Sequence, residues 1–266
     1  MNIYLQELRN YRRSTIIWIV SLCLIVFLFM SIYTSFALDV SSAKHLLEAY
    51  PPTVLAALNL KIEIFFTIYG FFAYLMTFAW LTAAIQAMNL GVSVLSKEVA
   101  GKTADFLLTK PITRVRMLSE KLAAVFTLIV ITNIFFLATS LLSAVAVSKG
   151  DLHIKLFFLI AVTMFFVQVF FLALGFMLGA IIPKVKTVVA VTLPVVFTFF
   201  ILSAFGGILK IDYINYLTPF KYFDPLYIYQ HSAYEPKYLL VLLGVVAACV
   251  GTSYASYMKK DIEAAS

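Results

Sequence analysis

Long apolar segments alternate with short charged segments along the 266-residue chain. A helix needs about 20 apolar residues to cross the ~30 Å hydrocarbon core of a bilayer. Six segments meet this requirement, at residues 15–38, 62–93, 122–147, 154–182, 187–209 and 237–258. The pattern predicts an all-α membrane protein whose six transmembrane helices form one domain over residues 1–266, with both chain ends on the same side.

Two polar segments beside the spans have amphipathic character. Within the first 13 residues, Tyr4, Leu8 and Tyr11 share one helical face beside three arginines, which predicts an interfacial elbow helix leading into the first span. Residues 210–236, between the fifth and sixth spans, contain six tyrosines and three prolines. Because tyrosine favours the membrane–water boundary, we expect helical segments in the outer leaflet there.

The composition agrees with a membrane protein. The chain is 63% hydrophobic and 12% charged, with a mean hydropathy of +0.99, which is more apolar surface than a soluble core of this size could bury. Cys23 and Cys249 fall near the middle of spans, where a thiol acts as a small apolar group, so the cysteines form no metal-ligand pattern.

Positive charges are distributed unequally between the two sides of the predicted bundle. The side with the chain ends and residues 94–121 and 183–186 carries thirteen Lys and Arg residues against seven on the other side, whereas the acidic residues number six and seven. Because Lys and Arg beside spans are retained in the cytoplasm, we expect a multi-pass protein of the cell membrane with both termini cytoplasmic. Anionic membrane lipid accounts for the net charge of +7 without nucleic acid as a partner.

The polar residues in the middle of the spans are uncharged, which disfavours an ion-coupled carrier. Asn133 and Gln168 lie at similar depth on neighbouring spans and predict an interhelical hydrogen bond. Thr82, Gln86 and Asn89 form a stripe on the second span that suits either packing or substrate contact. Small residues that allow close helix approach recur on three spans: Ala79, Ala83, Ala87 and Gly91; Gly175 and Gly179; Gly244 and Ala248.

Residues 96–121, between the second and third spans, read SKEVAGKTADFLLTKPITRVRMLSEK and carry nine charges. Gly101-Lys102-Thr103 matches the end of a phosphate-binding loop. However, Ser96 stands where that loop requires glycine, and a transmembrane helix precedes it instead of a strand. Nucleotide binding by this chain is therefore disfavoured.

The same segment has the signals of a helical hairpin. We expect a short helix at about 97–110, with Ser96 as its N-cap and Pro111 as its stop, and a second helix from Thr113 into the third span. Such a hairpin presents apolar and charged groups together and suits the docking of a soluble partner. An ordinary solvated loop is the alternative.

Two stretches of the sequence resemble the type 2 ATP-binding-cassette (ABC) exporter permeases. One resembles their coupling-helix signature, at Glu98, Gly101, Thr103, Phe106-Leu107-Leu108, Pro111, Arg114 and Lys121, and the other is YLTPFKYFDP at residues 216–225. The resemblance implies a permease that pairs with a second copy or a related permease and binds two separate ABC ATPase subunits. ATP and Mg²⁺ would be bound by the ATPase, and no cofactor by this chain. The implied ATPase-coupling residues are Glu98, Gly101, Lys102, Thr103, Asp105, Phe106, Leu107 and Arg114.

The resemblance also implies that spans two and five line a translocation path at the dimer seam. The candidate residues on this path are Phe72, Met76, Thr82, Gln86, Asn89, Phe197 and Phe200. An aromatic lining without fixed charge predicts a hydrophobic or amphipathic cargo. An amphipathic peptide, such as a toxin or antimicrobial peptide, is the first choice, followed by a lipophilic drug and then a lipid-linked glycan.

A function of another class is compatible with the same hairpin: a non-transporting membrane scaffold or regulator that recruits a cytosolic partner. An enzyme is disfavoured because the sequence has no buried acid pair, Ser/His arrangement or metal-ligand cluster. The three histidines, His45, His153 and His231, all fall at outer loops or span ends. The family resemblance implies that a separate subunit hydrolyses ATP, because no ATPase domain is fused to the residues of this sequence.

Overall fold

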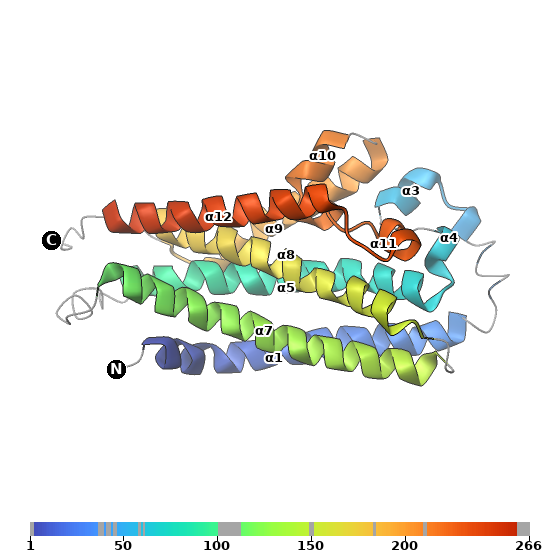
Figure 1. Ribbon diagram of the computed structural model, residues 1–266, viewed down its shortest axis with the longest axis horizontal. Helices are drawn as coiled ribbons and strands as arrows, with labels where there is room; N and C mark the ends of the chain where they lie inside the picture. The colour runs from blue at the N-terminus through green and yellow to red at the C-terminus, as the bar shows by residue number, and fades with distance from the viewer. Residues whose placement is uncertain are drawn as a thin grey trace.

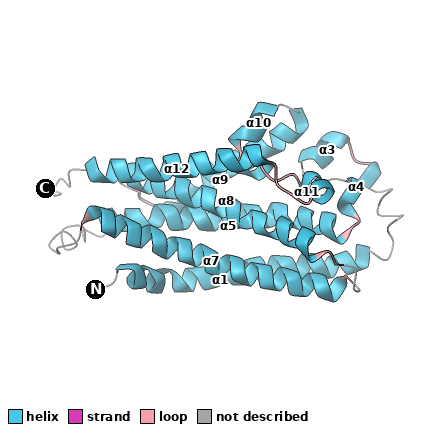
Figure 2. Cartoon of the chain, viewed as in Figure 1, coloured by secondary structure: helices cyan, strands magenta, loops and turns pink. Residues whose placement is uncertain are grey.

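The computed structural model describes residues 3–36, 40, 44, 47–57, 60, 62–100, 113–148, 152–182, 185–209 and 212–259. The regular elements of these residues are helices, and the long ones lie side by side in an elongated bundle (Figures 1 and 2). Six described helices are long and apolar enough to cross a membrane: α1 (Ile3–Phe36), α5 (Ile68–Ala100), α7 (Arg114–Val147), α8 (Ile154–Ile181), α9 (Val188–Leu209) and α12 (Pro236–Lys259). The predicted all-α fold with six spans is confirmed.

The two ends of the bundle differ in character (Figure 1). At one end α1 begins, α5 ends, α7 begins and α12 ends, and we call this the termini end. The opposite end, called the far end, holds the short helices α3 (Pro52–Ala57), α4 (Ile62–Phe65) and α11 (Pro225–His231). Helix α10 (Asp212–Leu217) and the 3-10 turn η1 (Pro219–Lys221) lead from α9 to α11, so the segment between the last two spans is helical as predicted.

Helices α5 and α8 form the centre of the bundle and are its most buried spans. Glycines allow them to approach closely. A Cβ atom on Gly91 would lie 2.6 Å from the carbonyl oxygen of Leu172, and one on Gly175 would lie 2.6 Å from that of Met88. No larger side chain fits at these distances unless a helix moves. The predicted role of small residues is confirmed for these two spans, whereas Gly244 of α12 has nothing within 4 Å.

The second span begins later than the predicted start at residue 62. That residue belongs to α4, and the chain turns at residues 66–67 before α5. Thr67 caps α5, because its hydroxyl accepts a hydrogen bond from the backbone N–H of Gly70 at 3.1 Å. A Cβ atom on Gly70 would lie 1.9 Å from the carbonyl oxygen of Ile64, so the turn requires glycine. Thr67 is the one polar residue from Ile64 to Gly70, which left the turn inside the apolar segment predicted as a single span.

The predicted elbow helix is not separate from the first span. Residues 3–36 form one helix, about 51 Å long at 1.5 Å per residue, because no Gly or Pro interrupts it. The apolar face predicted for its beginning is present, but it packs on the bundle. Tyr11 is buried, Leu8 packs against the core, and the hydroxyl oxygens of Tyr4 and Thr127 lie 3.1 Å apart. Neighbouring helices therefore cover a face that the sequence assigned to the membrane surface.

The tyrosine-rich segment is divided between the surface and the interior. Tyr213 of α10 is exposed, whereas Tyr222 is buried, and its hydroxyl donates a hydrogen bond to the carbonyl of Tyr216 at 2.8 Å. Burial raises the pKa of Tyr222 to about 12, with a smaller contribution from Tyr238. The hydroxyl of the partly buried Tyr234 donates to the carbonyl of Leu159 at 2.6 Å, so Tyr222 and Tyr234 fix the connection on the bundle.

Candidate coupling site at the termini end

The termini end holds two of the predicted ATPase-coupling residues. Glu98 lies in the last turn of α5, and Arg114 is the first residue of α7. The others lie outside the described residues: Gly101, Lys102, Thr103, Asp105, Phe106 and Leu107. Helix α5 continues through Ser96 to Ala100, so the prediction of Ser96 as an N-cap is wrong. Nothing before Gly101 breaks the helix, and a coupling helix beyond Ala100 stays a prediction.

Helix α7 begins where the sequence predicted. The side chain of Thr113 caps it by accepting a hydrogen bond from the backbone N–H of Arg116 at 3.4 Å, and the helix runs without interruption into the third span. Two contacts then join this beginning to the end of α12. Arg114 donates to the carbonyl of Met258 at 3.3 Å, and the hydroxyls of Ser119 and Tyr254 lie 2.8 Å apart.

Lys121, two turns into α7, joins three helices. Its ammonium group donates to Glu7 of α1 at 3.0 Å and to the carbonyl oxygen of Val94 in α5 at 2.9 Å. The lysine side chain is 1% exposed and that of Glu7 is 13% exposed. A charge this deeply buried is tolerated because it is both paired and hydrogen-bonded. The pair therefore fixes the beginning of α1 against α5 and α7.

These contacts form a polar cluster around the beginning of α7, made by Glu7, Arg114, Ser119, Lys121 and Tyr254. Through it, α7 contacts α1, α5 and α12 close to the point where residues 101–112 join α5 to α7. Any displacement of the beginning of α7 therefore acts on three other helices through hydrogen bonds as well as through packing. This arrangement suits a site that receives mechanical input from outside the bundle.

Sequence reasoning missed most of this cluster. Lys121 was named only as part of the coupling-helix signature of the family. Glu7, Ser119 and Tyr254 were not predicted as site residues. One signal was available, because a lysine at the entry of a long apolar helix needs an acidic partner if it is buried. Glu7 is the one acidic residue before the first span and was the natural candidate.

A second polar group lies deeper in the bundle and confirms the predicted hydrogen bond between Asn133 and Gln168, at 2.6 Å. Gln168 in turn donates to Gln86 at 3.0 Å, and Gln86 donates to Thr132 at 2.9 Å. All four side chains are buried. The network links α5, α7 and α8, and interhelical hydrogen bonds of this kind typically contribute about 0.6–2 kcal/mol each.

The residues predicted on the translocation path lie in two different environments. Phe72, Met76 and Gln86 are fully buried among the chain's own helices, and the Phe72 ring lies against that of Phe157, with centroids 4.2 Å apart and planes tilted by 31°. The other four are partly or largely exposed: Thr82, Asn89, Phe197 and Phe200. The structure does not gather the seven at one surface, and their role in transport stays a prediction.

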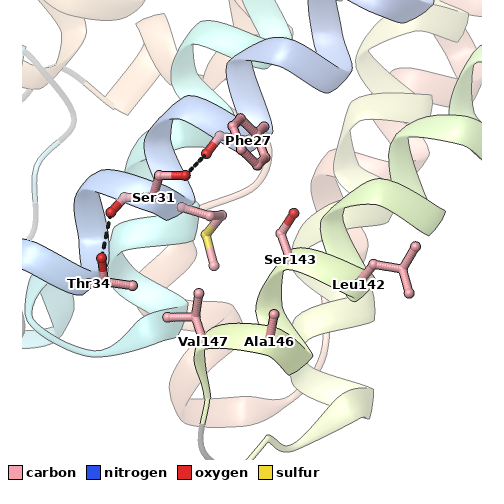
Figure 3. A pocket seen from close by; sticks show the side chains of 8 residues that line it. Phe27, Ser31, Thr34, Leu142, Ser143, Ala146 and Val147 are labelled. Atoms are coloured by element: carbon pink, nitrogen blue, oxygen red, sulfur yellow. Dashed lines mark hydrogen bonds between the residues drawn. The ribbon is translucent and has the colours of Figure 1, made fainter.

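A hollow of about 420 Å³ lies between α1 and α7 near the far end, and Figure 3 shows its lining. Phe27, Met30 and Leu142 supply apolar walls. The hydroxyls of Ser31 and Thr34 both donate to backbone carbonyls of α1, at 2.7 Å. None of the predicted path residues lines this hollow, which is distinct from the cluster at the termini end.

The six spans and the short loops of the described chain define a multi-pass membrane protein built as one helical bundle. A family model described as "ABC-2 family transporter protein" matches residues 1–262. The chain belongs to this family and is the transmembrane subunit of an ABC transporter, so the resemblance found in the sequence is confirmed. Subunits of this kind are generally not catalytic and work with ABC ATPase subunits. No curated protein matches the chain significantly.

Proposed function

We propose that this chain is the permease of an ATP-driven exporter in the cell membrane. The termini end faces the cytoplasm, in agreement with the excess of Lys and Arg residues predicted on that side. Two ATPase subunits dock there and supply ATP hydrolysis with their own Mg²⁺. The cargo is hydrophobic or amphipathic, with an amphipathic peptide as the first choice, a lipophilic drug as the second and a lipid-linked glycan as the third.

The observation that carries the coupling role is the contact of Lys121 with both Glu7 and Val94. This side chain lies two turns into α7, the helix that follows the segment on which an ATPase would press, and it joins α7 to α1 and α5. ATPase closure would displace residues 97–120 and would move α1, α5 and α12 with them. Coupling between distant sites requires a contiguous set of such contacts or an equivalent two-state element.

The exposed face of α9 supports a second permease copy or a related permease as a partner. Phe197, Ile201 and Phe205 recur at helical spacing and are 42%, 50% and 52% exposed. This span is also the least enclosed of the six. A second permease would cover the face and place Phe197 and Phe200 at the seam between the two chains, as the resemblance implied.

The coupling role is tested with the permease and its ATPase reconstituted together. We expect Glu98→Gln and Phe106→Ala to lower cargo-stimulated ATPase activity about fivefold or more while membrane insertion stays normal, because typical coupling free energies are 1–3 kcal/mol. Leu240→Ala is the matched control, since Leu240 is 70% exposed on α12 and lies away from the connection. Variants that bind the ATPase and transport as the parent does would contradict the proposal, and a chain that recruits a partner without any transport would favour a scaffold.

The cargo is tested separately, in vesicles that contain the same complex. We expect a labelled amphipathic peptide to accumulate across the membrane only when ATP is present. If a lipophilic dye or a lipid-linked glycan accumulated instead, the peptide would be rejected as the cargo, but the proposal that the chain is part of an exporter would stand.

A further inference from the structure

Three arginines lie on the outer side of α1, in the part of the helix nearest the termini end. Arg9, Arg12 and Arg13 are spaced at i, i+3 and i+4, so they share a face, and all three are exposed. The ion pairs formed among the described residues do not include them. Gln6 and Asn10 flank them on the same outer side and add uncharged hydrogen-bonding groups.

The acidic side chains that the structure describes near this part of α1 are engaged elsewhere. Glu7 points inward from the same part of α1 and pairs with Lys121. Glu120 of α7 pairs with Arg116 at 2.9 Å. Within the described part of the chain, therefore, no carboxylate neutralises the arginine face, and three permanent positive charges are available to an external anion.

The depth of these arginines in the membrane follows from the residues after them. Ile16, Ile17, Val20 and Leu24 continue the outer side of α1 and are 54–66% exposed. Arg13 and Ile16 are about 4.5 Å apart along the helix axis. The change from charged to apolar exposed side chains within one turn marks the boundary between headgroups and hydrocarbon, and the long arginine side chains reach the phosphate layer.

We infer that this face of α1 is a binding site for an anionic phospholipid in the leaflet at the termini end. The guanidinium groups of Arg9, Arg12 and Arg13 hold the phosphate and the anionic headgroup, because their planar donors form paired hydrogen bonds with phosphate oxygens. The acyl chains lie along Ile16, Ile17 and Val20. An acidic protein surface would also match the charges, but it would not use the apolar residues that continue the face.

Lipid bound at this site would also affect the polar cluster around the beginning of α7. Glu7 lies on the inner side of the turn whose outer side carries Arg9. A lipid held by the arginines fixes the depth of the helix that carries Glu7, and so supports its contact with Lys121. The inference requires only that α1 crosses the membrane, and it does not depend on the direction of transport or on the cargo.

The test is lipid binding to the purified full chain, measured by native mass spectrometry. Phosphatidylglycerol and phosphatidylcholine with the same acyl chains are titrated in turn. We expect preferential retention of phosphatidylglycerol by the parent, and binding on the order of 100-fold weaker in the triple variant R9Q/R12Q/R13Q, from the contribution typical of each basic residue at an anionic surface. Replacement of all three by Lys keeps the charge and is expected to weaken binding less.

The control variant K44Q/K155Q/K237Q removes three positive charges from exposed positions beside other elements and should leave this binding unchanged. Size-exclusion profiles verify folding, and single Arg→Gln substitutions, each expected to weaken binding about fivefold, replace a triple variant that does not fold. Equal affinity of the parent for the two lipids would overturn the inference. Equal losses of phosphatidylglycerol binding in R9Q/R12Q/R13Q and K44Q/K155Q/K237Q would also overturn it. So would a glutamine variant that keeps the lipid but loses the ATPase, since the face would then be a protein contact.

Discussion

A single buried lysine organises the termini end of the bundle. Lys121 satisfies its charge with Glu7 and one of its remaining donors with the carbonyl of Val94. Removal of one partner from a buried pair leaves the other charge uncompensated, which typically costs about 3–5 kcal/mol. Exposed pairs contribute far less, about 0–1 kcal/mol, because water screens them.

This contrast predicts the effect of removing the acid. Glu7→Gln should lower the free energy of unfolding in detergent by about 3 kcal/mol, because the Lys121 ammonium then lies buried without a counter-charge. The double variant Glu7→Gln with Lys121→Met should lose less than the sum of the two single variants. Denaturant titrations of the three variants provide the measurement.

The matched control is Glu235→Gln, which breaks the exposed pair between Lys237 and Glu235. This change should cost at most about 1 kcal/mol. An equal loss of unfolding free energy in Glu7→Gln and Glu235→Gln would show that the buried pair of Glu7 and Lys121 stabilises the protein no more than an exposed pair does.

At the scale of the helices, the association of α5 with α8 depends more on the close approach of their backbones than on the size of their side chains. A Cβ atom on Gly91 or Gly175 would lie 2.6 Å from a backbone carbonyl oxygen of the opposite helix. Van der Waals packing between close backbones is a principal source of helix association in membranes, where lipid tails are as apolar as the side chains. The buried hydrogen bonds of Gln86 and Gln168 then fix α5 relative to α8.

The two glycine environments predict opposite results for the same substitution. Gly175→Ala should destabilise the protein by about 1–3 kcal/mol, because its Cβ atom would meet the carbonyl oxygen of Met88 at 2.6 Å and would push the helices apart. Gly244→Ala should be neutral or stabilising by up to about 1 kcal/mol, since nothing lies within 4 Å and alanine favours a helix. Thermal unfolding midpoints in detergent compare the two, and a larger loss at Gly244 would contradict this account.

For the whole molecule, the arrangement of the ends predicts the topology. Helix α12 ends at the termini end, and α8 begins at the opposite end. If the termini end is cytoplasmic, a cysteine at Lys155 should react with an impermeant thiol reagent added to intact cells. A cysteine at Lys259 should react only in inverted vesicles.

The labelling uses a background in which Cys23 and Cys249, both free thiols, are replaced by Ala. The cysteine-free protein, without a new cysteine at Lys155 or Lys259, is the control and should show no labelling. The reverse pattern of labelling would place the termini end outside the cell and would reject the proposed orientation.

The sequence by itself determined the class of fold, the number of spans and the family. A helix that crosses about 30 Å of hydrocarbon must be long and apolar, and this requirement leaves an unmistakable pattern in the chain. The spans predicted at 154–182, 187–209 and 237–258 match α8, α9 and α12 to within one residue at each end, whereas α7 begins before the span predicted at 122–147. The hydrogen bond between Asn133 and Gln168 was also predictable, because two polar side chains at equal depth have few other partners.

Only the tertiary structure decided which faces of the helices meet. Hydropathy is the same for an apolar residue that faces lipid and for one that faces another helix, so the packing of Tyr11 on the bundle and the turn at Thr67 were not visible in the sequence. Glu7 and Lys121 are 114 residues apart in the chain and become partners only when α1 lies beside α7. The same packing leaves Arg9, Arg12 and Arg13 exposed on the outer side of α1, where we infer that they bind an anionic lipid.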